Sequence, residues 1–114
     1  MISLMDNLNP IFQALADPTR RAILARLAKG SANVGTLAEP FKISPPAISR
    51  HLKVLEEASL ISNERCGKQR LCRLKPETLA VAQEWLDFSR RFWTGSFDRL
   101  ASHLTSRRGS KDRD

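Results

Sequence analysis

A mainly α-helical domain with one small β-hairpin is the fold class that the sequence predicts. Apolar residues recur at helical spacing in four segments before residue 60 and in a long segment after residue 76. Between these segments the pattern changes to a period of two, which is typical of strands. A chain of 114 residues with 41% hydrophobic and 27% charged residues can bury one core. We therefore expect one domain over residues 1–104 and, over residues 105–114, a disordered polar tail that lacks large apolar side chains.

The first thirty residues predict two helices. Asp17 followed by Pro18 is a helix-start signal, because the carboxylate can accept from the unpaired amides of the first turn and proline lacks one such amide. Apolar residues then follow at helical spacing until Gly30, which ends the second helix. The segment 10–16 predicts a shorter helix that packs on the same core.

Two further helices follow, separated by a tight turn. Residues 34–41 place apolar side chains at positions i, i+3, i+4 and i+7, which predicts one short amphipathic helix. Ser44 can cap the next helix, in which Ile48, Leu52 and Leu55 form the buried stripe. The opposite face of that helix carries Pro46, Arg50, Lys53 and Glu57.

A hairpin and a long helix complete the predicted elements. Residues 60–74 alternate with period two about a turn at Gly67 and Lys68, and Pro76 opens the last helix. The order helix, turn, helix, hairpin is that of a winged helix-turn-helix, whose second helix enters the major groove of DNA.

The charge of the chain favours a polyanionic partner. The formal net charge is +7, and residues 42–75 hold eight Lys and Arg against three Glu. Double-stranded DNA is therefore the expected partner. Candidate contacts on the second helix of the pair are Ser44, Pro46, Ala47, Ser49, Arg50, His51 and Lys53. Candidate contacts on the hairpin are Arg65, Lys68, Gln69 and Arg70, and Arg73 adds a fourth cation there.

Plainer interpretations of these residues stay open. Ser44 can serve only as an N-cap, and His51 can be a packed or phosphate-contacting side chain. The charges on the helix can form a solvated face, and those on the hairpin can resist edge pairing between sheets.

Two stretches carry a resemblance to a known family. These are ALADPTRRAILARL and LAEPFKISPPAISRHLKVLEEASLI, and a basic hairpin follows the second. From about Asn7 to Leu104 the chain resembles ArsR/SmtB-type winged helix-turn-helix transcriptional repressors. The resemblance implies a homodimer that binds an inverted-repeat operator. Lys42 departs from the family pattern, in which glycine often occupies the tight turn.

Aromatic residues on the last helix predict a homodimer. Five of the seven aromatic residues lie there, and an exposed row of large rings is more stable when it is covered by a second copy of the chain. The expected interface combines the first and last helices and comprises Phe12, Leu15, Trp85, Phe88, Phe92, Trp93, Phe97 and Leu100.

Other function classes find little support in the sequence. We expect no enzymatic activity, because there is no glycine-rich phosphate loop, no serine elbow and no clustered metal ligands. We also expect no metal site, no cofactor, no membrane span and no leader, and a cytoplasmic location. The metal-ligand patterns common in the resembled family are missing, and the sequence identifies no effector.

Two alternatives remain. The chain can be a winged-helix module that binds another protein, or a thiol-redox-responsive regulator that uses Cys66 and Cys72. These cysteines should lie on opposite strands of the hairpin without facing each other directly. One or both can also pack beneath the hairpin as small apolar side chains.

Overall fold

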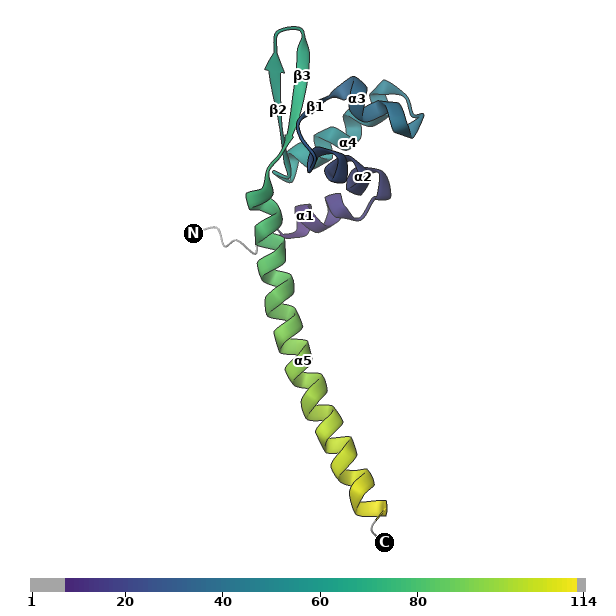
Figure 1. Cartoon of the computed structure of the whole chain (residues 1–114), viewed down its shortest axis with the longest axis vertical. Coiled ribbons are helices and arrows are strands. Elements are labelled where there is room, and N and C mark those ends of the chain that lie inside the picture. Colours follow the sequence, from purple (N-terminus) through teal and green to yellow (C-terminus); the bar gives the residue numbers. More distant parts are fainter. Residues whose placement is uncertain (1–7, 113–114) are drawn as a thin grey trace. The chain divides into compact units, whose positions relative to one another are not determined.

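The structure is a computed structural model that describes residues 8–112, with side chains described for residues 8–105. Residues 1–7 of the predicted domain and residues 113–114 of the predicted tail lie outside the described part. The described chain forms two compact units, 8–82 and 83–112. In order, the elements are α1 (Leu8–Leu15), α2 (Pro18–Leu27), β1 (Ala32–Asn33), α3 (Val34–Ala38), the 3₁₀-helix η2 (Glu39–Phe41), α4 (Pro45–Glu57), β2 (Ile61–Cys66), β3 (Gln69–Leu74) and α5 (Pro76–Asp112), as drawn in Figure 1.

Side-chain caps fix where three helices of the first unit begin. The Asp17 carboxylate accepts from the backbone amide of Arg20 at 3.0 Å, which caps α2. Asn33 caps α3 in the same way, and Ser44 caps α4. Pro45 follows Ser44 at the first position of α4, where a missing amide hydrogen costs nothing. The helix starts predicted at Asp17 and Ser44 are confirmed.

Lys42 makes the tight turn before α4 in the left-handed conformation, with φ 52° and ψ 34°. A lysine in this conformation costs roughly 1 to 2 kcal/mol relative to a right-handed residue. The turn therefore keeps the geometry that glycine would supply and stores a small strain directly before α4.

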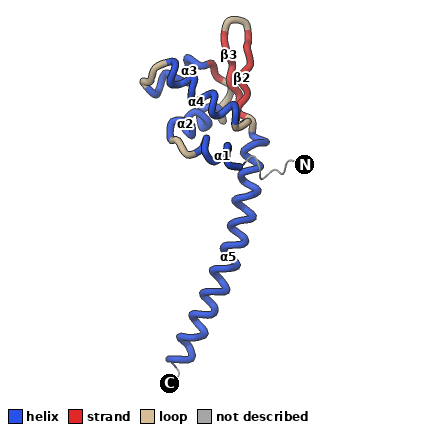
Figure 2. The backbone as a smooth tube through the Cα atoms, turned by 180° about the vertical axis from the view of Figure 1, so that it is seen from behind, coloured by secondary structure: helices blue, strands red, loops and turns tan. Residues whose placement is uncertain are grey.

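A three-stranded antiparallel sheet has the order β1-β3-β2. The hairpin of β2 and β3 turns at Gly67 and Lys68, as predicted, and Gly67 has a φ of 62° that suits glycine. The strand β1 was not expected, because two residues are too few to show a period. It pairs Ala32 with Cys72 at the base of β3, and the strands are drawn in red in Figure 2.

One core holds the first unit together. Its fully buried large side chains come from α1, α2, α3, α4, the α4–β2 connection and the sheet, and they are Ile11, Ile23, Leu37, Ile48, Leu55, Leu60, Ile61 and Cys72. The stripe predicted on α4 is confirmed, because Ile48, Leu52 and Leu55 are all buried. The core therefore fixes which side of α4 remains exposed.

The second unit is the part of α5 beyond Ala82. The sequence predicted one domain over residues 1–104, whereas the structure divides the chain here because no described residue after Ala82 belongs to the core. The backbone of α5 continues as a helix to Asp112, where the sequence predicted a disordered tail. No proline interrupts the segment, and its polar residues are compatible with a helix. None of the described helices combines the length and apolar character that a bilayer span demands.

Candidate nucleic-acid interface

Helix α4 exposes the side that carries the predicted DNA contacts. Pro46, Ser49, Arg50 and Lys53 are exposed, whereas Ala47 and His51 are half-buried. The exposed residues are opposite the buried stripe, so that the core holds α4 and leaves this face to solvent. The ion pair of Lys53 Nζ with Glu57 Oε1, at 4.0 Å between two exposed side chains, adds little to stability.

Ser44 acts as a helix cap. Its Oγ accepts from the backbone amide of Ala47 at 3.3 Å, which uses the oxygen and leaves the hydroxyl proton available for donation. The N-cap interpretation of Ser44 is therefore confirmed, and a contact with a base or a phosphate stays a prediction.

The hairpin presents its cations on two different faces. Arg65 pairs with Arg70 across the strands, on the same face as the pair of Asn63 and Cys72 nearer the core. Arg73 pairs with Ser62 and therefore lies on the other face. Of the four cations that the sequence placed together, Arg65 and Arg70 share the face that packs toward the core, and Arg73 is separated from them. Lys68 is exposed in the turn.

Two grooves flank the exposed ridge of α4. One is lined by Ser49 and Lys53 of α4 together with Asn63 and Arg70 of the hairpin, and also by Val34, Leu52 and Glu56. The other is lined by Arg20 of α2 together with Ala47, Arg50, His51 and Val54. Because α4 turns by about 100° per residue, these two sets lie on opposite flanks of the helix. Cationic side chains therefore border α4 on both sides.

Arg20 is a residue of this surface that the sequence analysis missed. Its Nη1 lies 3.3 Å from Nδ1 of His51, thirty-one positions later in the chain. Asp17 Oδ2 lies 3.8 Å from the same His51 nitrogen. The backbone amide of Arg20 holds the pKa of Asp17 below its ordinary value against the opposing effect of desolvation, and the charges of His51 and Arg20 add smaller effects in the lowering direction. Nothing in the sequence around Arg20, a basic residue in the first turn of a helix, indicated that its side chain would contact α4.

The two cysteines lie in different environments. Cys66 is exposed at the end of β2, and Cys72 is buried in the core, where desolvation raises the pKa of its thiol. Cys66 pairs with Gln69 and Cys72 with Asn63, which confirms that the cysteines do not face each other. Within residues 8–105, no three side chains of the His, Cys, Asp and Glu types come together as a metal site would require.

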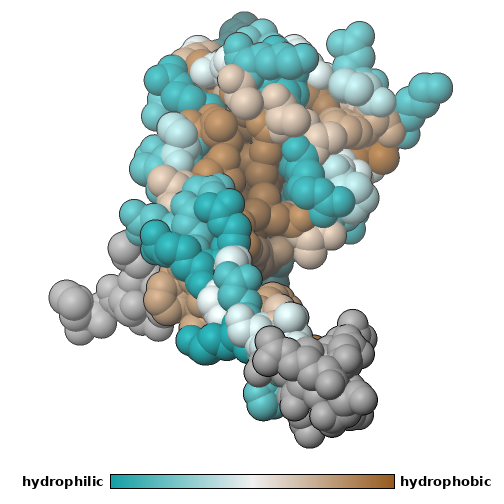
Figure 3. Space-filling view, turned by 60° about the horizontal axis from the view of Figure 1, so that its bottom comes forward, coloured by the Kyte–Doolittle hydropathy of each residue, from teal (hydrophilic) through white to brown (hydrophobic). Residues whose placement is uncertain are grey.

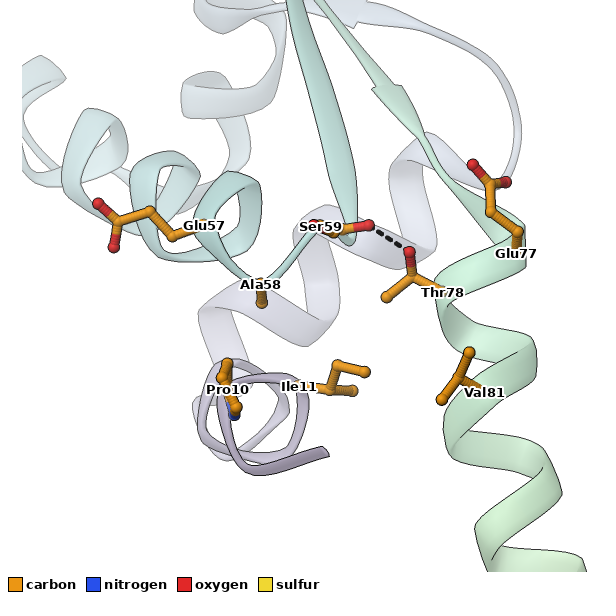
Figure 4. Close-up of a pocket in the computed structure, with 8 residues that line it drawn as sticks. All are labelled: Pro10, Ile11, Glu57, Ala58, Ser59, Glu77, Thr78 and Val81. Carbon is orange, nitrogen blue, oxygen red and sulfur yellow. Dashed lines mark hydrogen bonds between the residues drawn. The ribbon is translucent and has the colours of Figure 1, made fainter. Parts of the chain in front are cut away.

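A separate hollow of about 290 Å³ lies between α1, the end of α4 and the first turns of α5. Figure 4 shows Ile11 and Val81 directed toward each other across it, whereas the carboxylates of Glu57 and Glu77 point away. The hydroxyl of Thr78 donates to the backbone carbonyl of Ser59, which ties the start of α5 to the α4–β2 connection. The hollow therefore has a mixed polar and apolar lining and does not concentrate carboxylates.

The predicted dimer residues fall into two classes. Phe12 and Leu15 of α1 are partly buried against the core of their own unit. The α5 residues are exposed, from 36% for Trp85 to 62% for Phe97, and they include Phe88, Phe92, Trp93 and Leu100. The ring of Trp93 contacts the rings of Phe92 and Phe97, with centroid distances of 5.5 and 6.1 Å. Hydrophobic residues gather at the surface in a tract bordered by hydrophilic ones in Figure 3.

Comparison with known proteins gives concordant matches. Residues 15–62 match a family described as a helix-turn-helix domain. The chain is 45% identical over 95 residues to the HTH-type transcriptional regulator Rv2034 of Mycobacterium tuberculosis, covering 83% of this chain and 86% of that protein. It is 40% identical over 79 residues to the transcriptional repressor SdpR of Bacillus subtilis, covering 69% and 88%.

A solved structure agrees with these relatives. The crystal structure of the ArsR family transcriptional regulator RHA00566 matches with a TM-score of 0.74 and 41% identity, covering 77% of this chain and 97% of that one. The similarity therefore extends over nearly the whole of that protein.

Proposed function

Because the chain belongs to the ArsR/SmtB family of winged helix-turn-helix transcriptional regulators, we propose that it is a homodimeric repressor that binds an inverted-repeat operator in double-stranded DNA. Binding at a promoter would exclude the transcription machinery. A regulator of this kind works in the compartment that holds the promoter, for which we propose the cytoplasm.

Helix α4 reads the base sequence in this proposal. Its N-terminal half exposes Ser49 and Arg50, and a guanidinium can donate two hydrogen bonds to the major-groove edge of guanine. Ala47 can contact a thymine methyl group, and Ser44 can donate its hydroxyl proton. Lys53 is one turn further along and suits a phosphate at the groove wall.

The hairpin acts as the wing and fixes the register of the domain on the DNA backbone. Arg65, Lys68 and Arg70 supply positive charge near the tip, and Gln69 supplies an amide donor. Contacts of this type position a protein without reading sequence, and they make its affinity dependent on salt.

The exposed aromatic residues of α5 support the homodimer. Each large aromatic ring can bury about 150 to 250 Å². Five such side chains, each 36 to 62% exposed, would therefore cover a large part of the roughly 800 Å² per partner of a standard interface. A two-fold axis pairs the same surface on both copies and presents two α4 helices to successive major grooves, about 34 Å apart.

The single observation that carries the proposal is the exposed face of α4 with cationic grooves on both flanks. The test is selection of bound sequences from a random pool of duplex DNA, followed by a salt titration on the recovered site. We expect a two-fold symmetric motif, with half-sites about one helical turn apart and affinity that falls steeply with salt. Absence of any enriched motif would refute the proposal and favour a module that binds another protein.

A further inference from the structure

The groove on the α2 side of α4 contains a guanidinium that the fold holds in place. Arg20 Nε donates to the carbonyl of Ala14 at 2.7 Å, and Nη2 donates to the carbonyl of Gln13 at 3.0 Å. Both carbonyls belong to the last turn of α1. A guanidinium that is fixed in advance loses little side-chain entropy when it binds an anion, since the fold has already ordered it.

The third contact of Arg20 is with His51, whose Nδ1 lies 3.3 Å from Nη1. A guanidinium can only donate, so His51 Nδ1 accepts from Nη1 in the tautomer that carries its proton on Nε2. The described hydrogen bonds of Arg20 also use three of its five N–H groups, which leaves two for a ligand.

The charge of the groove is suitable for an anion. Arg20, Arg50 and His51 line it with the small side chains of Ala47 and Val54, and no carboxylate is among the lining residues. Asp17 is the acidic neighbour of His51, and the amide of Arg20 and the start of α2 offset part of its charge. The groove therefore keeps a net positive charge directly beside the side chain that is proposed to read guanine.

We propose that Arg20 and His51 form a phosphate-binding pocket that takes one backbone phosphate of DNA on the flank of α4 opposite the wing. Two free guanidinium N–H groups and His51 Nε2–H donate to the phosphate oxygens. This contact, together with the wing, clamps the backbone on both sides of α4 and sets the depth at which Arg50 enters the groove. The inference rests on the proposed function, which supplies the DNA.

The test compares Arg20→Gln with Arg21→Gln. Arg21 is the next residue, is exposed and also donates to a carbonyl at the end of α1, that of Leu15, but it does not line the groove. DNA affinity is measured by fluorescence anisotropy on the selected operator and on random duplex, over a range of salt. We expect Arg20→Gln to weaken both by roughly tenfold and to lower the salt slope by about one. Arg21→Gln should keep the slope of the unaltered protein.

Ethylation interference on the unaltered protein makes the test independent of whether Arg20→Gln folds. One ethylated phosphate per half-site, beyond those at the wing, should block binding. The same interference should persist with the Arg21→Gln variant. It should disappear with the Arg20→Gln variant, provided that the far-ultraviolet circular dichroism spectrum of that variant shows an unchanged fold. Equal salt slopes for the two variants, or no such phosphate, would overturn the pocket while leaving operator binding intact. Failure of the unaltered protein to bind any DNA would instead overturn the proposed function.

A titration with inorganic phosphate is the second part of the test. The phosphate is added to the DNA-free protein at constant ionic strength while the His51 ring resonances are followed. We expect no saturation below about ten millimolar, because one fixed guanidinium and one imidazole N–H hold a lone phosphate weakly in water. Saturation at micromolar phosphate would assign the pocket to a free anion and overturn its assignment to DNA.

Discussion

Arg65 and Arg70 lie directly opposite each other on the two strands of the hairpin. Like charges in directly opposed positions destabilise a strand pair by roughly 0.2 to 1 kcal/mol. The hairpin near its tip therefore carries a repulsion in the free protein that a polyanion between the two guanidinium groups would relieve.

We expect Arg65→Gln to raise the free energy of unfolding by roughly 0.2 to 1 kcal/mol without DNA, because it removes this repulsion. The same change should weaken binding to operator and random duplex alike and lower the salt slope by about one. Thermal unfolding and salt-dependent anisotropy measure the two effects. Arg73→Gln is the matched control, since Arg73 lies opposite Ser62 on the other face. A loss of affinity for Arg73→Gln equal to that for Arg65→Gln would contradict the assignment of faces.

We expect Arg50 to contribute to sequence specificity and Lys68 to contribute to affinity for any DNA sequence. Arg50→Ala is expected to lower the discrimination between operator and random DNA by about 1 to 3 kcal/mol, because it removes a bidentate contact with guanine. Lys68→Ala should weaken binding to all sequences by a similar factor and flatten the salt dependence. Competition binding with operator and random duplex separates the two. This assignment of roles would be refuted by variants that lose the same affinity on both DNAs.

The thiols should differ strongly in reactivity in the folded protein. Cys66 is exposed, whereas Cys72 is buried and its raised pKa keeps the thiol protonated at neutral pH. The positions of Cys66 and of Asn63, the partner of Cys72, are three residues apart on β2, about 10 Å along the strand. A disulfide needs Cα atoms within about 7 Å, so the hairpin cannot close one without rearrangement.

Thiol counting with a chromogenic reagent tests this prediction. One thiol should react within minutes in the native protein, and the second only after denaturation. Mild oxidation should leave the monomer without an internal disulfide. An internal disulfide with a change in operator binding would instead support the thiol-redox alternative.

Local signals in the sequence were sufficient for most of the fold. Asp17 and Ser44 begin helices where their side chains predicted it, and the stripe of Ile48, Leu52 and Leu55 identified the buried side of α4. The period-two pattern of the hairpin and its turn at Gly67 were also predicted from the sequence. Each of these features depends on residues within a few positions of one another.

Features that depend on contacts between residues distant in the chain could not be predicted from the sequence. The strand β1 is defined by its pairing with β3, forty residues later, and the contact of Arg20 with His51 spans thirty-one positions. Neither Arg20 nor His51 carries a periodic or composition signal for this contact. Arg70 and Arg73 lie three residues apart on one strand and therefore on opposite faces, but which of them shares a face with Arg65 depends on the exact register across the turn, which a one-residue slip would reverse.

The α5 surface makes the last prediction, which concerns assembly. Phe92 is 56% exposed and contacts the Trp93 ring edge-on, so a second copy of the chain could bury it without disturbing the core. We expect Phe92→Glu to weaken dimerisation by about 30-fold or more, since loss of a central aromatic side chain costs about 2 kcal/mol and a charge would be buried in its place. Sedimentation equilibrium measures the effect. Thr94→Glu is the control, because two residues along a helix place the same charge about 160° away. Phe92→Glu should also lose affinity for the full inverted repeat while retaining the weaker binding to a single half-site.

A Phe92→Glu protein that sediments as a dimer at low micromolar concentration would contradict the prediction. The dimer interface would then lie outside α5, and another surface of the chain would have to pair the two α4 helices.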